Sequence, residues 1–445
     1  SSRRRHTRYP LVTGVQTCAL RICMNVFKFG GASVKDAAAV KNAGAILKLH
    51  QEEELVVVIS AMGKVTNALE KIVDAHVYQT AKSAELLEEL KNYHLNIVKE
   101  LFHDSNHPIY NKLNNFFVEI EWVLEEPPRD YDFVYDQIVC FGELLSTSII
   151  SEWLLENGVT NQWLDVRDCL ITDNTYREGK INWEVSTELF QQRLNDLFKQ
   201  SKVIITQGFI GSTTENFSIT LGREGSDYTA AIIAHIMNAN SVTIWKDVPG
   251  VLNADPKHFS DAQKLIQLSY QDAIELAYYG ASVIHPKTIK PLENKAIPLH
   301  VKSFLDPNSK GTVIGKDLET KPLIPSFIFK SNQVLISIAA KDFSFIAEEN
   351  LSEIFSAFAH AGIKLNLMQN SAISFSVCID DSSKKEALID QLKIKYKVKY
   401  NAGLQLYTIR HYYPSTIESL TVGKEILLEQ RSRTTAQLVT KEITK

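Results

Sequence analysis

A short turn near the start of the chain has the residue types of a phosphate-binding cradle. Lys28–Ser33 (KFGGAS) ends a predicted strand, and its two glycines would let backbone N–H groups approach an anion. Lys28 would supply a fixed positive charge beside it. A tight turn with a solvated lysine accounts for the same residues. The turn matches neither GxxxxGKS/T nor GxGxxG, which excludes a P-loop and a dinucleotide fingerprint.

A second glycine-bearing turn carries side chains that could hold a carboxylate. Thr220–Thr229 (TLGREGSDYT) leads into a helix predicted over Ala230–Met237. Arg223 offers a guanidinium clamp, and Ser226 and Asp227 offer polar groups at the start of the helix. A plain N-cap role for Ser226 or Asp227 explains the pattern equally well.

Three smaller features also carry polar chemistry. Trp245–Gly250 (WKDVPG), followed by Asn253–Lys257, could border a nucleotide base, although Asp-Val-Pro-Gly is also an ordinary turn. Glu143 starts a helix after the strand-like Asp136–Phe141, where its carboxylate could receive an ammonium group; an exposed first-turn glutamate is the alternative. We expect a structural role for His285, because no Ser or Cys nucleophile motif accompanies it.

Composition limits the classes of protein that remain. The chain has 445 residues, 44% hydrophobic and 22% charged, which predicts two to three domains. Its formal net charge of −4 gives no general basic surface for nucleic acid. No run of about 18 apolar residues occurs, which excludes a membrane span by this criterion. His and Cys residues show no metal-ligand spacing, so no metal site is predicted.

The first 23 residues differ from the rest. They contain five of the 48 basic residues and no Asp or Glu, so the remainder has 43 basic against 52 acidic residues, a net charge of −9. We interpret residues 1–23 as a non-native leader, similar to translated sequencing-adapter sequence, with Met24 as the native start. Beyond it, Cys140, Cys169 and Cys378 are widely spaced and form no CxxC, which favours half-buried thiols in a reducing, cytoplasmic compartment.

The elements that would position these side chains alternate between short β-branched runs and helices, which predicts an α/β fold with a mostly parallel sheet. A long helical stretch, Leu69–Ile120, predicts an extra helical layer or lid. The other predicted elements are strands at Asn25–Phe29, Leu55–Ser60, Val203–Thr206, Ser218–Leu221 and Ser241–Trp245, and a helix at Val34–Leu49.

The pattern changes between residues 320 and 330. The following elements have the β-α-β-β-α-β order of a ferredoxin-like unit: Gln333–Ala340, Glu349–Ala361, Lys364–Asn370, Ser374–Asp380, Lys384–Lys393 and a strand to about Asn401. A partial second copy would comprise Leu404–Arg410, Pro414–Leu420, Glu425–Leu428 and Ala436–Thr440. We therefore predict a catalytic domain over 24–325 and a regulatory region over 326–445, with one full and one abbreviated unit.

Taken together, the motifs resemble the amino-acid kinase family, in its aspartate kinase branch. Eight stretches match in the family's order: Lys28–Val34 (KFGGASV), Val57–Leu69 (VVISAMGKVTNAL), Phe141–Ser146 (FGELLS), Trp163–Asp173 (WLDVRDCLITD), Gln207–Gly211 (QGFIG), Thr220–Ala230 (TLGREGSDYTA), Trp245–Pro256 (WKDVPGVLNADP) and Glu275–Pro286 (ELAYYGASVIHP). The resemblance implies an amino-acid kinase-like αβα sandwich. The C-terminal region resembles the ACT regulatory region of such kinases.

The resemblance implies phosphoryl transfer from MgATP to the side-chain carboxylate of L-aspartate, giving 4-phospho-L-aspartate for lysine, threonine and methionine synthesis. A carboxylate is already a deprotonated nucleophile, so this reaction needs alignment and charge cancellation rather than a strong base. By resemblance, Lys28 stabilises the transferring group and Asp227 orients Lys28. Substrate binding would fall to Arg223 and Ser226 at a carboxylate, Glu143 at the ammonium group, and Thr66. Nucleotide binding would fall to Lys28, Gly30, Gly31, Ser33, Lys246, Asp247, Lys257, Ser282 and Val283, with Mg²⁺ held mainly through the phosphates.

Five positions depart from the family's pattern. Ala32 stands where Thr is usual, Glu224 where Gly is, Lys246 where Thr is, Lys257 where Arg is, and Ser282 where Lys is. Glu224 could compete for the Arg223 guanidinium, and Lys246 could bind the phosphate in place of the lysine that is usual at position 282. The candidate catalytic residues are all present, so we do not expect an inactive kinase.

The ACT resemblance further implies a homodimer or higher oligomer, because ACT units usually pair across subunits, and feedback inhibition by lysine, threonine or both. Another carboxylate kinase of the superfamily, of glutamate 5-kinase or acetylglutamate kinase type, is the nearest alternative. A non-catalytic amino-acid sensor is an alternative from another class.

Overall fold

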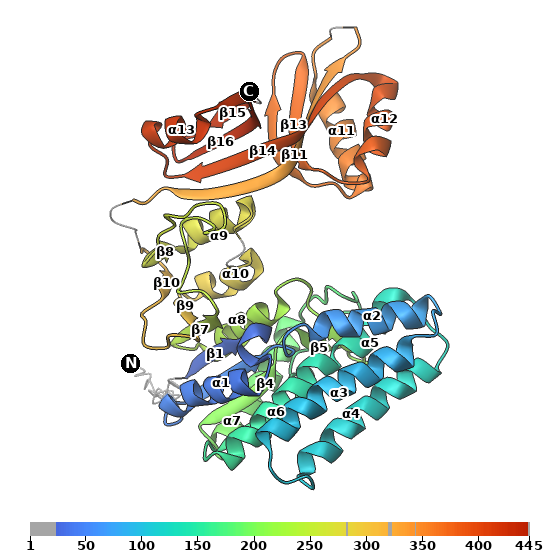
Figure 1. The fold of residues 1–445 in the computed structure, drawn as a ribbon, viewed down its shortest axis with the longest axis vertical. Coiled ribbons are helices and arrows are strands. Elements are labelled where there is room, and N and C mark those ends of the chain that lie inside the picture. Colours follow the sequence, from blue (N-terminus) through green and yellow to red (C-terminus); the bar gives the residue numbers. More distant parts are fainter. Residues whose placement is uncertain (1–23, 282–283, 319–322, 343, 444–445) are drawn as a thin grey trace, which may run out of the picture.

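The strand Asn25–Phe29 (β1) lies inside an eight-stranded sheet with the order β3-β4-β2-β1-β7-β9-β10-β8. The structure is a computed structural model that describes residues 24–281, 284–318, 323–342 and 344–443, so the predicted leader 1–23 lies outside the described residues. The first six strands in this order, β3, β4, β2, β1, β7 and β9, are parallel to one another. Strand β10 is antiparallel to β9. The predicted mostly parallel α/β fold is confirmed (Figure 1).

The central strands are buried on both faces, because helices cover the sheet on both sides. Every residue of Leu55–Ile59 (β2) and Val203–Gln207 (β4) is buried, as their almost wholly apolar sequences predict. The remaining strands of this sheet are Asn161–Leu164 (β3), Ser241–Lys246 (β7), Gln267–Ser269 (β8), Leu299–Ser303 (β9) and Thr312–Gly315 (β10). The helices around them are Ala37–Leu49 (α1), Trp183–Phe198 (α7), Gly225–Met237 (α8), Tyr270–Tyr279 (α9) and Pro286–Asn294 (α10).

The predicted extra helical layer is present at one side of this domain (Figure 1). It consists of Val65–Val77 (α2), Ser83–Leu101 (α3), Pro108–Glu125 (α4) and Tyr131–Val139 (α5). The next helix, Phe141–Glu156 (α6), packs directly against β3 and β4 of the sheet. The predicted strand over Asp136–Phe141 is wrong, since these residues belong to α5 and α6. Thirteen of the 16 residues of α6 are buried. The mispredicted residues form a short, mostly buried run where the two helices meet, and periodicity alone cannot distinguish such a run from a buried strand.

By length and composition alone, Tyr131–Glu156 would be apolar enough to cross a membrane, but 89% of its apolar window is buried inside the domain. It is therefore a core helix pair. The three described cysteines are also fully buried rather than half-buried as predicted, since Cys140, Cys169 and Cys378 are 0%, 1% and 0% exposed. They lie in or beside the hydrophobic cores.

The C-terminal region forms a separate six-stranded sheet with the order β12-β13-β11-β14-β16-β15 (Figure 1). Its strands are Ser326–Ala340 (β11), Leu365–Asn370 (β12), Ser374–Asp380 (β13), Tyr396–Arg410 (β14), Lys424–Arg431 (β15) and Thr435–Glu442 (β16). Its helices are Glu348–Ala361 (α11), Lys385–Lys395 (α12) and Pro414–Thr421 (α13). The order β12-β13-β11-β14, antiparallel throughout, is that of the predicted ferredoxin-like unit.

The predicted break between a strand ending near Asn401 and another starting at Leu404 is wrong, because β14 runs through both. Asn332 (φ 52°) and Gly403 (φ 68°) lie at two consecutive register shifts in the β11–β14 pairing, one on each side of the Gln333–Leu404 pair. A bulge keeps two strands paired across such residues, whereas a glycine in the sequence favours a turn. The two ferredoxin-like halves therefore share β11 and β14 in one sheet.

Candidate active site

A cavity of about 650 Å³ opens where strands and turns of the eight-stranded sheet end. Among the residues lining it are seven that sequence patterns predicted: Lys28, Thr66, Glu143, Arg223, Ser226, Asp227 and Lys246. Lys28 lies near the carboxyl end of β1, and Lys246 ends the neighbouring parallel strand β7. Ligands of α/β sheets bind at this carboxyl edge. The fold thus brings together residues up to 218 positions apart in sequence.

Lys28 and Asp227 form a buried ion pair. Lys28 Nζ lies 2.5 Å from Asp227 Oδ1, and Lys246 Nζ lies 3.7 Å from Asp227 Oδ2. Burial alone would raise the pKa of Asp227, but the two ammonium groups outweigh it and hold that pKa below its usual value. Lys28 is only 8% exposed, so it is not a solvated turn lysine. Asp227 lies inside the first turn of α8, whose N-cap is Glu224, so the N-cap explanation fails.

Glu143 is a buried carboxylate, and one of its two oxygens lacks a hydrogen-bond partner among the described residues. It is 2% exposed, in the first turn of α6, and the Ala61 backbone N–H donates to Oε1 at 3.1 Å. Oε2 has no hydrogen-bond partner among the described residues. Burial raises the pKa of Glu143 to about 8, although the Ala61 amide and the Lys28 charge act in the opposite direction. A carboxylate in this state lacks a cation, which the ammonium group of a ligand can supply.

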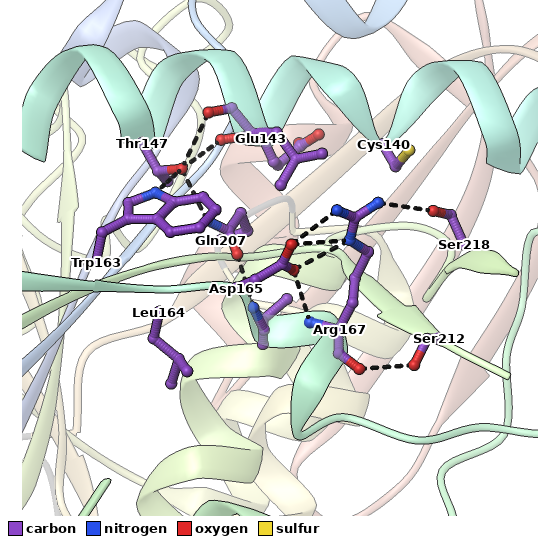
Figure 2. Close-up of polar contacts among 12 residues, drawn as sticks. Cys140, Glu143, Thr147, Trp163, Leu164, Asp165, Arg167, Gln207, Ser212 and Ser218 are labelled. Carbon is purple, nitrogen blue, oxygen red and sulfur yellow. Dashed lines mark hydrogen bonds and ion pairs between the residues drawn. The ribbon is translucent and has the colours of Figure 1, made fainter. Parts of the chain in front are cut away.

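Polar groups behind α6 brace Glu143 (Figure 2). Thr147 Oγ1, one turn further along α6, donates to the Glu143 carbonyl at 2.8 Å and accepts from Trp163 Nε1 at 3.0 Å and Gln207 Nε2 at 2.9 Å. Next to this group, Asp165 and Arg167 form an ion pair at 2.7 Å. Trp163 of the WLDVRD motif and Gln207 of the QGFIG motif therefore support the helix that carries Glu143, whereas Phe209 of the second motif lines the cavity.

The glycine turn after β1 lies beside the cavity wall and is tightly packed. Gly31 begins a 3₁₀ turn, Gly31–Val34, and a Cβ at Gly31 would lie 2.8 Å from the Ala61 carbonyl oxygen. Ser33 Oγ donates to the Trp245 carbonyl at 3.3 Å, which ties this turn to β7. This packing explains the glycine at position 31, because any side chain there would collide with the Ala61 and Gly63 carbonyl oxygens.

The remaining predicted nucleotide residues are not gathered in the 650 Å³ cavity. Asp247 and Lys257 are exposed, and neither lines it. Ser282 and Val283 lie outside the described residues. His285 accepts a hydrogen bond from the Lys287 N–H at 3.1 Å and caps α10, which confirms its structural role. In the part of the chain that the structure describes, no group of three or more His, Cys, Asp or Glu side chains could hold a metal ion.

Glu224, which stands where the family has Gly, adopts a left-handed backbone (φ 55°). Glycine takes this conformation without strain, so the departure carries a local cost of about 1–3 kcal/mol. Within the described residues, no ion pair joins Glu224 to Arg223, so the expected competition for the guanidinium is absent. Glu224 Oε2 is instead buried without a hydrogen-bond partner from that part of the chain.

Sequence patterns missed Asp136 as an organiser of the site wall. This carboxylate is 0% exposed, accepts from Thr220 Oγ1 at 2.6 Å, and accepts from the Arg177 N–H at 2.8 Å. Asp136 therefore links α5 to the strand Ser218–Thr220 (β6), which precedes Arg223. It also links α5 to the loop that carries Arg177, a residue that lines the cavity. Burial raises the pKa of Asp136 to about 6, which hydrogen bonds partly offset. No motif marks it, because its partners are distant in sequence.

Comparisons with known proteins agree with this architecture. The amino acid kinase family model matches residues 24–303. Lysine-sensitive aspartokinase 3 of Escherichia coli is 31% identical over 412 residues, which cover 90% of this chain and 89% of that protein. The solved structure of E. coli aspartokinase III with lysine and aspartate has a TM-score of 0.80 at 27% identity, covering 94% and 95% of the two chains. The same enzyme with aspartate and ADP has a TM-score of 0.77 over 94% and 95%.

The family-model match spans more than half of the chain, and the fold and the site agree with it. The chain belongs to the amino acid kinase family. Relatives that match most of its length include the E. coli aspartokinase described above.

Proposed function

We propose that this protein is an aspartate kinase, which transfers the γ-phosphoryl group of ATP to the side-chain carboxylate of L-aspartate and releases ADP and 4-phospho-L-aspartate. The observation that carries this proposal is a single cavity lined by the cationic groups of Lys28 and Arg223 and by the Glu143 carboxylate, whose Oε2 has no hydrogen-bond partner among the described residues. An amino acid with two carboxylates complements these charges: its ammonium fits Glu143, and its α-carboxylate fits Arg223 and Ser226, next to Thr66.

The acceptor carboxylate is already ionised, so the protein has to align it and to stabilise charge on the transferring group. Lys28 is fixed by Asp227 at 2.5 Å and therefore presents its ammonium without reorganisation. Lys246 adds a second ammonium group beside the same aspartate. These residues position and neutralise, which is what phosphoryl transfer demands.

The glycine turn suits a nucleotide phosphate, because the space beside the Gly30 Cα is bordered by the Lys28 ammonium, 3.5 Å from where a Cβ would lie. We assign Gly30, Gly31 and Ser33 to the phosphates, with Lys246 compensating for Ser282, and Asp247, Lys257 and Val283 to the rest of the nucleotide. Mg²⁺, held through the phosphates, would neutralise part of their charge.

We infer that the six-stranded sheet is an ACT-type regulatory region that binds an inhibitory amino acid, lysine or threonine or both. The names of the relatives support this inference, since one is called lysine-sensitive and was solved with lysine. Pairing through such sheets would give a homodimer. A cytoplasmic location accords with three buried, unpaired cysteines in the described chain.

An ADP-release assay with ATP and L-aspartate tests the activity. We expect turnover with L-aspartate and at least 100-fold lower kcat/KM with L-glutamate and N-acetyl-L-glutamate. Preference for either of those would identify another carboxylate kinase. Absence of turnover with all three, together with retained binding of lysine or threonine, would identify a sensor.

A further inference from the structure

A second cavity, of about 440 Å³, lies between the kinase domain and the six-stranded sheet. On the kinase side it is lined by Arg223, Glu224, Gly280 and His285. Arg223 and Glu224 also line the first cavity, so the two cavities meet at the turn before α8. The proposed phosphotransfer uses none of the groups on the sheet side.

The sheet side of this cavity is polar. Five strands contribute a polar side chain each: Lys330 (β11), Asn366 (β12), Asp380 (β13), Thr408 (β14) and Gln437 (β16). Lys330 Nζ donates to Asn366 Oδ1 at 2.8 Å, and Asn366 Nδ2 donates to Asp380 Oδ1 at 3.0 Å. The hydrogen bonds hold the charged groups in place around the cavity. Convergence of a few polar side chains on one cavity is typical of ligand-binding sites.

Glu224 gives the cavity an unsatisfied acceptor. Its Oε2 atom is buried without a hydrogen-bond partner in the described chain, and its backbone is left-handed at φ 55°. Leaving a buried acceptor unpaired costs about 1–3 kcal/mol or more for a charged group. A donor on a ligand in either adjoining cavity would remove this cost, and a strained, unpaired side chain is typical of functional positions.

The charges around the cavity define the ligand class. Three cationic side chains line it, Arg223, Lys330 and Lys364, against two carboxylates, Glu224 and Asp380. Burial lowers the pKa of His285, so this imidazole adds no charge near neutral pH. The set has a net charge of +1, so a zwitterionic ligand with one net negative charge, such as an acidic amino acid, complements it. We propose that the interdomain cavity is a second ligand site, which binds an acidic amino acid between the kinase domain and the regulatory sheet.

The site would act on catalysis through Arg223. A carboxylate bound between Arg223 and Lys364 draws the guanidinium away from the first cavity, so the ligand would raise the KM for L-aspartate with little change in kcat. This consequence rests on the proposed function, whereas occupancy of the site does not.

Isothermal titration calorimetry of the full chain with L-aspartate and, separately, L-glutamate tests the site. The Glu143→Gln variant weakens the first cavity, and we expect one binding event to persist in it for at least one of the two amino acids. Adding Lys364→Met or Asp380→Asn to that variant should raise the remaining Kd at least tenfold. Adding Lys399→Met, at an exposed lysine of β14 outside the cavity, should leave the Kd within twofold.

Loss of all binding in Glu143→Gln alone would overturn the proposal, because every event would then belong to the first cavity. A Kd within twofold of the Glu143→Gln value after both Lys364→Met and Asp380→Asn would overturn it as well. Both side chains are exposed, so these variants should fold. Calorimetry needs no turnover, so a failed kinase assay leaves the result interpretable.

Discussion

Two equally buried carboxylates of the same cavity have pKa values that are shifted in opposite directions. Asp227 and Glu143 are each 2% exposed. Asp227 has two ammonium groups within 4 Å and stays ionised, whereas Glu143 has one backbone amide and its pKa rises to about 8. The difference follows from pairing, since a buried charge is tolerated only beside an opposite one. The cavity thus combines a cation that Asp227 holds in place, Lys28, with a carboxylate that lacks a cationic partner, Glu143.

Replacing Lys28 with alanine should lower kcat roughly 10²–10³-fold or more, because it removes a preorganised cation from a desolvated site. Steady-state ADP release measures the change. Lys41→Ala, at an exposed lysine of α1, is the matched control and should leave kcat within twofold. Near-normal turnover of Lys28→Ala would contradict the assignment.

The KM for L-aspartate should fall as the pH rises from 6 to 8 and level off above. Below its pKa of about 8, Glu143 is protonated in the free enzyme and must lose that proton to bind an ammonium group. KM measured across this range at constant ionic strength tests the expectation. Glu143→Gln should have a raised KM with little pH dependence, and an equally steep dependence in that variant would assign the effect to another group.

At the scale of elements, the turn after β1 contains two adjacent glycines with different surroundings. A Cβ at Gly31 would meet the Ala61 and Gly63 carbonyl oxygens at 2.8 and 2.9 Å, whereas at Gly30 the nearest atom is Lys28 Nζ at 3.5 Å. Gly31→Ala must therefore displace backbone, and we expect a destabilisation of about 1–3 kcal/mol. Gly30→Ala should cost less than about 0.5 kcal/mol.

Thermal unfolding of the two variants beside the unmodified protein measures the difference. Because Gly31 also begins the proposed phosphate cradle, Gly31→Ala should raise the KM for ATP as well. Equal melting temperatures for the two variants would show that the turn relaxes freely.

At the scale of the whole molecule, a buried arginine joins the two domains. Arg410 of β14 binds Asp272 at 2.7 Å and Glu275 at 3.0 Å, both on α9, and its side chain is 7% exposed. Burial alone would raise the pKa of Asp272, but hydrogen bonds from His411, Arg410 and Ser269 hold it well below its usual value. Strand β14 of the six-stranded sheet is therefore bound to α9, and the last residues of α9 line the second cavity.

Arg410→Gln should destabilise the protein by about 2–3 kcal/mol, because it leaves two half-buried carboxylates without their cation. We expect a lower melting temperature and separate transitions for the two domains in calorimetry. Arg431→Gln, at an exposed arginine of β15 paired with Glu429, should change little. A single unshifted transition in Arg410→Gln would show that the domains are held together by other contacts.

The sequence predicted best where local pattern and burial agree. The apolar strand at Leu55–Ile59, the helical layer and the order of the ferredoxin-like unit follow from such patterns. It failed at Asp136–Phe141, a short run with five of six residues buried that periodicity cannot distinguish from a strand, and at Gly403, where a bulge replaces a turn. Seven candidate site residues could be named in advance because glycine turns and motifs mark them.

By itself, the sequence determined which chemical groups this protein can use: glycine turns, a lysine, an arginine and two carboxylates suited to phosphate and amino-acid substrates. Only the tertiary structure decided their states, because desolvation and pairing depend on neighbours that are distant in sequence. It places Lys28 on Asp227, leaves Glu143 open, anchors the site wall on Asp136, and forms the second cavity between two domains. Burial and charge pairing are properties of packing, and a linear pattern does not contain them.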